Sequence, residues 1–193
     1  MLTPPTRPPL NGDERFVGFD AVVEDFWRFA IPDLLVNNVR GWLAEYLVWR
    51  ALGVEQPRRI EWDAFDIEWE GIRLEVKSSA YLQAWEQKKL SNLLFTGLAA
   101  RYWPLDGVTI AETATYNADV YVFCANTAAA HDEYNALDLG LWHFTVLSRV
   151  SVERIGQKSL TWAKALDKSG GEVAWADLAD AVRQAAAENA PRG

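Results

Sequence analysis

The sequence predicts an α/β protein in which a central mixed sheet is flanked by helices. Three observations predict it: helix-spaced apolar residues come first, apolar runs of strand length follow, and a tail of mixed strand and helix patterns ends the chain. At 193 residues, half of them hydrophobic, the chain is long enough for one well-packed domain and short for two. We expect one domain at 16–193, preceded by a proline-rich flexible arm at 1–15.

The elements are expected in the following order along the chain. Apolar residues spaced three and four apart predict helices at 19–31, 37–54, 149–156 and 174–190. The second helix would be capped by Asn37 or Asn38 and closed at Gly53. Alternating or continuous apolar runs predict strands at about 60–69, 72–79, 91–98, 118–126 and 141–148.

The distribution of charge bears on possible partners. The net charge of −8 alone argues against nucleic acid, because phosphate binding needs a positive surface. From 40 to 101, however, the chain has nine basic and nine acidic residues, and the excess acid lies in the flanks, with 10 basic and 18 acidic residues. The neutral centre therefore leaves nucleic-acid binding open.

Neither a signal peptide nor a membrane span is expected. The first 33 residues lack a basic region followed by an apolar one, and no run of 18 apolar residues is free of charge. The single cysteine, Cys124, lies in an apolar run typical of a buried strand in a reducing compartment. We expect a cytoplasmic protein that has no membrane partner.

A β-hairpin is expected around the dipeptide Glu70-Gly71. If these two residues form the turn, directly opposed residues have numbers that add up to 141. One face of the hairpin is then wholly apolar and belongs against the core. Its pairs are Trp69 with Ile72, Ile67 with Leu74, and Phe65 with Val76.

The other face of the hairpin carries charges. Glu68 opposes Arg73 favourably, whereas Asp66 opposes Glu75, and Lys77 follows on the same side. Opposed like charges destabilise a sheet. Either the face is simply exposed to solvent, or a cation such as Mg²⁺ lies between the carboxylates, since Mg²⁺ binds carboxylate oxygens. A lysine beside such an ion is typical of a hydrolytic site.

The spacing of Asp66, Glu75 and Lys77 across this turn resembles the signature of the PD-(D/E)XK nuclease superfamily, which has the restriction-endonuclease-like fold. The resemblance spans about 37–126, with a C-terminal extension at about 140–190, and is nearest to an uncharacterised bacterial branch. It implies an αβββαβ core: a helix, a three-stranded meander whose second and third strands carry the motif, a helix and a further strand. Phe65 stands where the proline of the signature would be.

The resemblance also implies roles for individual residues. Asp66, Glu75 and the carbonyl oxygen of Val76 would bind Mg²⁺ or Mn²⁺, and Lys77 would be the catalytic lysine. Glu45, on the first core helix, would add a further catalytic and metal-binding carboxylate. The alternative for Glu45 is a buried bond to a backbone amide or to an arginine.

Residues just after the motif are candidates for binding nucleic acid. Hydroxyl, amide and ammonium groups contact phosphates, and an aromatic side chain can stack on bases. The candidates are Ser78, Ser79, Gln83, Trp85, Lys88 and Lys89.

The sequence thus predicts a Mg²⁺-dependent DNA endonuclease, of the kind that serves restriction, phage defence or repair. RNA stays open as a target, and a homodimer is expected because one site cuts one strand. The alternative is a catalytically silent protein with a nuclease fold that acts as a binding or structural subunit.

Overall fold

A computed structural model describes residues 8–55, 59, 64–100 and 114–189. The chain divides into two compact units, Met1–Leu34 and Leu35–Gly193. The first unit thus ends at Leu34, beyond the expected arm at 1–15. Each unit is described by itself.

Within residues 8–34, the first unit contains the helix α1 (Val23–Ala30), shorter than the helix expected at 19–31. An isolated β-bridge between Arg15 and Val22 precedes it. The carboxylate of Asp25, in the first turn of the helix, accepts a hydrogen bond at 3.0 Å from the N–H of Val22, the N-cap residue. This bond stabilises the beginning of the helix. Phe26, Trp27 and Phe29 are exposed within this short unit.

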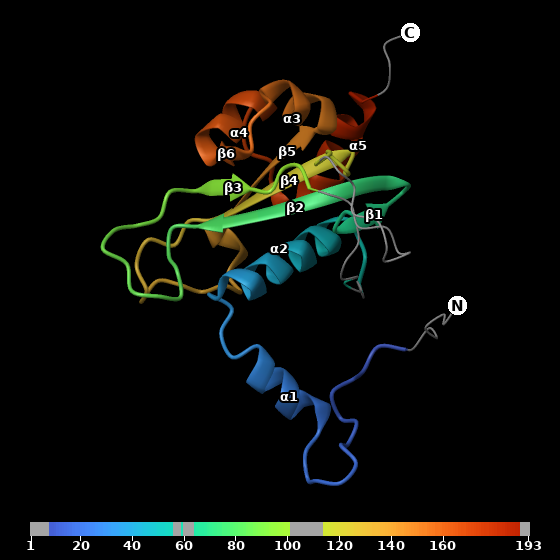
Figure 1. The fold of residues 1–193 in the computed structure, drawn as a ribbon, viewed down its shortest axis with the longest axis vertical. Coiled ribbons are helices and arrows are strands. Elements are labelled where there is room, and N and C mark those ends of the chain that lie inside the picture. The colour runs from blue at the N-terminus through green and yellow to red at the C-terminus, as the bar shows by residue number, and fades with distance from the viewer. Residues whose placement is uncertain (1–7, 56–58, 60–63, 101–113, 190–193) are drawn as a thin grey trace. The chain divides into compact units, whose positions relative to one another are not determined.

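The second unit is built on a four-stranded mixed sheet in the order β1-β2-β4-β5 (Figure 1). The strands are β1 (Ile67–Trp69), β2 (Ile72–Ala80), β4 (Val120–Asn126) and β5 (Trp142–Ser148). β2 pairs with β1 antiparallel and with β4 parallel, and β4 pairs with β5 antiparallel. The expected α/β class with a mixed sheet flanked by helices is therefore confirmed.

The helices and a second, two-stranded sheet complete the unit. The small sheet pairs β3 (Leu94–Thr96) with β6 (Ser159–Thr161). The α-helices are α2 (Asn37–Ala51), α3 (Arg149–Ile155), α4 (Trp162–Ser169) and α5 (Leu178–Ala187). Short 3₁₀ turns lie at η1 (Leu139–Leu141) and η2 (Trp175–Asp177).

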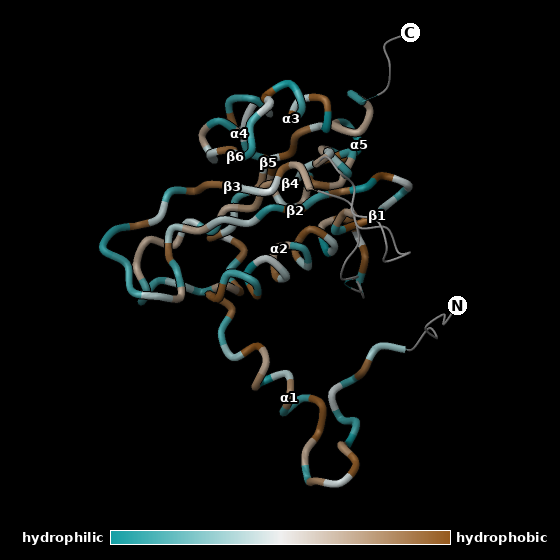
Figure 2. The backbone as a smooth tube through the Cα atoms, in the orientation of Figure 1, coloured by the Kyte–Doolittle hydropathy of each residue, from teal (hydrophilic) through white to brown (hydrophobic). Residues whose placement is uncertain are grey.

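Two hydrophobic cores lie on opposite faces of the large sheet. On one face, α2 and α5 pack with the apolar side chains of Ile67, Leu74 and Val76. On the other, α3, α4 and the small sheet pack around Tyr121 and Phe123. Every residue of β4 is buried, as the continuous apolar run predicted. Figure 2 shows hydrophobic residues recurring along α2 and the central strands.

The predicted hairpin turn is confirmed, and so is the register over the three pairs of the ladder. The predicted pairs Asp66 with Glu75 and Phe65 with Val76 are not part of the ladder. Glu70 and Gly71 both have positive φ, at 52° and 75°, which is the geometry of a type I′ two-residue turn. The ladder pairs Ile67 with Leu74, Glu68 with Arg73 and Trp69 with Ile72.

The C-terminal helix is tied to this hairpin. Arg183 of α5 donates from two nitrogen atoms to the carboxylate of Glu70, at 2.8 and 2.9 Å, and its guanidinium lies 4.6 Å from the centre of the Trp69 ring. In η2, the indole N–H of Trp175 donates to the Leu47 carbonyl of α2 at 2.9 Å. α5 therefore contacts the turn, and η2 contacts the helix that precedes it.

The strand expected at 60–69 is wrong in extent. β1 is only Ile67–Trp69; residues 64–66 form a bend, and residues 60–63 lie outside the described part. The apolar face is also shorter than predicted, because Phe65 packs against the core on the opposite face from Val76. The ladder begins at Ile67, so Phe65 lies outside it and need not follow the alternation of sides along the strand.

Two further predictions about helices need correction. Asn37 and Asn38 do not cap α2: Val36 is the N-cap residue, and the Asn37 side chain accepts a hydrogen bond from Arg40 at 2.6 Å. α4 was not expected from the apolar pattern. It begins at the capping side chain of Thr161, which accepts the Lys164 N–H, and ends at Gly170 in the left-handed conformation.

None of the helices in the described residues combines the length and apolar character needed to cross a bilayer.

Core packing on β2 gives the first prediction. Leu74→Ala removes a fully buried side chain, and we expect it to lower the free energy of unfolding by about 2–5 kcal/mol. Urea unfolding followed by circular dichroism measures this loss. The matched control is Leu137→Ala, the same change at a residue that is 77% exposed, for which a change within about 0.5 kcal/mol is expected. Equal losses in the two variants would contradict the packing described.

Candidate functional site

The candidate site lies at an edge of β2 that β1 leaves open. β1 pairs with β2 only over Ile72–Leu74, whereas β2 continues to Ala80. In an antiparallel ladder the N–H and C=O of one residue point the same way, so those of Val76, two residues beyond Leu74, also point toward the β1 side. The Val76 N–H donates to Oδ2 of Asp66 at 2.7 Å. A side-chain carboxylate thus occupies the place of a neighbouring strand.

Glu75 and Lys77 lie on the next part of the same strand. They alternate with Leu74 and Val76, so their side chains point to the face covered by β3. Lys77 Nζ donates to Glu75 Oε1 at 2.5 Å, and both side chains are about four-fifths buried. A Cβ on Gly97, just after β3, would lie 3.5 Å from Lys77 Nζ, which places the ammonium group beside the chain that follows β3.

Glu45 reaches the site from α2. Its side chain is only 12% exposed and accepts a hydrogen bond from Nε of Arg59 at 2.8 Å. The Arg59 guanidinium also lies 5.5 Å from the centre of the Trp42 ring. Of the two readings of Glu45, the structure contains the bond to an arginine; its metal-binding role stays a prediction.

The three carboxylates share one electrostatic environment. Burial, followed by the charges of Asp66 and Glu75, raises the pKa of Glu45 to about 7 despite the opposing effect of Arg59. Burial raises the pKa of Asp66, while the Val76 N–H and the charges of Lys77 and Arg59 oppose this. Burial and the charge of Asp66 raise the pKa of Glu75, and Lys77 opposes this. The negative charges of Asp66, Glu75 and Glu45 are therefore costly in this state.

The residues fit a divalent cation in part. The hydrogen bonds described above use Asp66 Oδ2 and Glu75 Oε1. The second oxygen of each carboxylate and the Val76 carbonyl on the same strand edge are the groups that could bind a cation. Within the described residues, no three or more His, Cys, Asp or Glu side chains are grouped as a ready metal cluster. Glu45 is bonded to Arg59, and Glu75 to Lys77.

The predicted nucleic-acid contacts separate into two groups. Ser78 points toward α2, where a Cβ on Gly41 would lie 3.9 Å from its Oγ. Ser79 and Gln83 are buried: Ser79 Oγ accepts the Leu94 N–H at 3.1 Å, and Gln83 Nε2 donates to the Ala80 carbonyl at 3.0 Å. These two side chains hold the loop after β2 in place.

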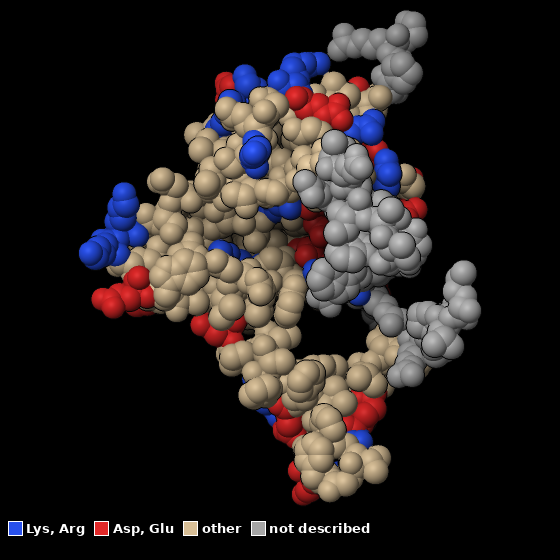
Figure 3. All heavy atoms as spheres, viewed as in Figure 1, with Lys and Arg blue, Asp and Glu red and all other residues tan. Residues whose placement is uncertain are grey.

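Trp85, Lys88 and Lys89 form the other group. All three are exposed on the loop between β2 and β3, and the Trp85 side chain is among the most exposed aromatics of the second unit. Figure 3 shows basic side chains gathered at the tip of this loop. They are available to a ligand, whereas Ser79 and Gln83 are not.

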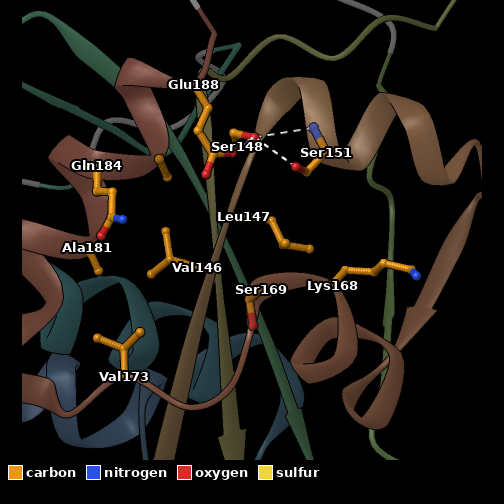
Figure 4. Close-up of a pocket in the computed structure, with 11 residues that line it drawn as sticks. Val146, Leu147, Ser148, Ser151, Lys168, Ser169, Val173, Ala181, Gln184 and Glu188 are labelled. Atoms are coloured by element: carbon orange, nitrogen blue, oxygen red, sulfur yellow. Dashed lines mark hydrogen bonds between the residues drawn. The ribbon is translucent and has the colours of Figure 1, made fainter.

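A separate pocket lies between β5 and the C-terminal helices (Figure 4). It measures about 150 Å³ and contains none of the predicted site residues. Ser148 caps α3 by accepting the Ser151 N–H at 3.2 Å, and its hydroxyl donates to Glu188 Oε2 at 2.7 Å. These bonds join α3 to the residues at the end of α5, so the polar groups that make them have a structural role.

Sequence reasoning missed the part played by Arg59. Its side chain contacts both Glu45 and Trp42. The ion pair spans 14 positions in the chain, so no local spacing rule could have found it.

Comparison of the chain with protein-family models, with curated proteins and with solved structures gave no match.

The Asp66 carboxylate gives the second prediction. Asp66→Asn keeps an oxygen acceptor for the Val76 N–H, whereas Asp66→Ala removes it. We expect the alanine variant to lose about 1–3 kcal/mol of unfolding free energy and the asparagine variant to lose less, because an unpaired buried donor is costly. Urea unfolding measures the loss, and amide hydrogen exchange at Val76 tests its cause. Equal exchange protection in both variants would contradict this role.

The pKa of Glu45 gives the third prediction. A carboxyl group whose pKa is raised in the folded state binds more protons there than in the unfolded chain, so its effect is a fall in stability as pH rises from about 4.5 to about 7. The fall should be at most about 3 kcal/mol.

Urea unfolding of the wild type and of Glu45→Gln at several pH values between these limits measures it. The difference in unfolding free energy between wild type and variant should shift against the wild type as pH rises. A difference that does not change with pH would refute the assignment.

Proposed function

We propose that this protein is a metal-dependent endonuclease that hydrolyses DNA phosphodiester bonds and is related to the PD-(D/E)XK superfamily. One observation carries the proposal: Asp66, Glu75 and Lys77 meet at a strand edge that carries the Val76 carbonyl. A scaffold alone gains little from burying Asp66 and Glu75 together, since each raises the cost of charging its neighbour.

The order of elements supports the same proposal. α2 precedes the hairpin, Asp66 lies just before β1 while Glu75 and Lys77 lie on β2, and β4 pairs with β2 in parallel. The proposed αβββαβ core also needs a first strand before β1 and a helix between β2 and β4. Neither is among the elements of the described residues.

Asp66, Glu75 and the Val76 carbonyl would hold Mg²⁺ or Mn²⁺, with Glu45 as a further carboxylate. A bound ion of this kind supplies positive charge that polarises a phosphate group and activates water. It would also offset the cost of the buried carboxylate charges.

Lys77 would act directly on the phosphate. An ammonium group has three hydrogen-bond donors, and the bond to Glu75 uses one of them. The other donors can stabilise the negative charge that develops on a phosphate oxygen during attack by water. The bond to Glu75 fixes the direction of the ammonium.

A catalytically silent binding or structural subunit is the second candidate. It is favoured by the ion pairs Lys77 with Glu75 and Arg59 with Glu45, which partly offset the carboxylate charges without a cation. The net charge of −8 also favours it.

The fourth prediction separates the two candidates. Purified wild-type protein with Mg²⁺ or Mn²⁺ should nick or linearise supercoiled plasmid, and Glu75→Ala and Lys77→Ala should each lose about 10²-fold or more of this activity. Lys77→Ala should retain the rise in melting temperature that Mg²⁺ produces, because the ion binds the native state, whereas Glu75→Ala should lose it.

Glu68→Gln is the matched control, since Glu68 is an exposed carboxylate on the same hairpin and belongs to no proposed role. It should cut and bind metal as the wild type does. Absence of both cutting and metal stabilisation in the wild type favours the silent subunit, and full cutting by Lys77→Ala refutes the role given to that lysine.

A further inference from the structure

The outer side of α2 carries a row of exposed aromatic and cationic residues. Trp42, Tyr46 and Arg50 are spaced four apart, so they lie along one side of the helix. Trp42 is 37% exposed and Tyr46 is 45% exposed, although both rings are large enough to bury in the core. The opposite side of α2 packs in the core, where Ala44 and Val48 are completely buried. The exposed row is therefore free to contact a ligand.

Two arginines lie over these rings. The guanidinium carbon of Arg59 is 5.5 Å from the centre of the Trp42 ring, and that of Arg50 is 5.9 Å from the centre of the Tyr46 ring. Both distances are near the outer limit of about 6 Å for such contacts, so the interaction is weak and the rings can accept another partner. Arg50 donates to the Tyr46 hydroxyl and to the Glu55 carbonyl, and neither oxygen neutralises its charge.

The row is joined to the candidate site by direct contacts. Glu45 is three residues after Trp42 on the same helix, and Arg59 contacts both side chains. Glu45 in turn interacts electrostatically with Asp66 and Glu75. A chain lying along Trp42 and Tyr46 is thus held beside the carboxylates.

We infer that the row formed by Trp42, Tyr46, Arg50 and Arg59 binds single-stranded DNA, with bases stacked on the two rings and phosphates beside the two guanidinium groups. The inference rests on the proposed function and names its substrate class. Aromatic rings combined with cations are the chemistry by which proteins hold unpaired nucleotides. The bases of a duplex are stacked on one another and do not offer free faces without unstacking, so the row discriminates against duplex DNA.

The test is direct binding by the full chain in EDTA, so that cutting does not interfere. Fluorescence anisotropy is measured with a labelled DNA strand of about 15 nucleotides, a size that spans typical single-strand sites. The same measurement uses its blunt duplex and an RNA strand of the same sequence. We expect the single DNA strand to bind about 10-fold or more tightly than its duplex. No binding of the single strand, equal binding of the duplex, or tighter binding of the RNA overturns the inference.

Variants assign the binding to the row. Trp42→Ala with Tyr46→Ala should weaken single-strand binding about 30-fold or more, given the usual contribution of each stacked base. Trp42→Phe with Tyr46→Phe keeps an aromatic ring at each position and should bind within about 3-fold of the wild type. Leu137→Ala, an exposed apolar residue outside the row, is the matched control. Circular dichroism and melting temperature check that each variant folds.

Failure of this inference and failure of the proposed function are distinguishable. If the wild type cuts plasmid in a metal-dependent way but the double alanine variant binds the single strand as tightly as the wild type, the binding role of the row is wrong. The proposed nuclease activity would then still stand. Single-strand binding that depends on both rings, with no metal-dependent cutting of plasmid or of single-stranded DNA by the wild type, would support the row and count against the nuclease.

Discussion

The hydrogen bond from the Val76 amide to the Asp66 carboxylate is the contact on which the site depends. If β1 began several residues before Ile67, its main chain would pair with this part of β2 and no acidic side chain would lie at this edge. Because the ladder ends early, a side chain completes the pairing of β2, and the carboxylate is fixed between the main chain and its neighbours. The same early end lets Phe65 turn to the other face of the sheet.

Burial of the carboxylates lowers the stability of the folded state when they are charged, and their cationic partners partly offset this loss. Asp66, Glu75 and Glu45 each have a raised pKa, first because of burial. Lys77 and Arg59 oppose these shifts from two sides, one on β2 and one beside α2. The site is thus a balance between desolvation and opposite charge, in which removing any one charged partner leaves another uncompensated.

The sequence was informative wherever neighbours along the chain decide the outcome. The turn at Glu70-Gly71, the register and the buried strand at 120–126 follow from local conformation and alternation. The side chosen by Phe65 and the partner of Glu45 depend on tertiary contacts that no spacing encodes. α4 could have been found, because Thr161 and Gly170 are ordinary signals for the beginning and end of a helix.

The link between Arg183 and Glu70 has a consequence for folding during synthesis. The hairpin that carries Asp66 and Glu75 leaves the ribosome more than a hundred residues before the arginine that holds its turn. Until residue 183 has emerged and α5 has formed, the turn lacks its contact with the guanidinium, and the Trp69 ring lacks its cover. The nascent hairpin therefore lacks these two contacts, which form only after the late helix has been made.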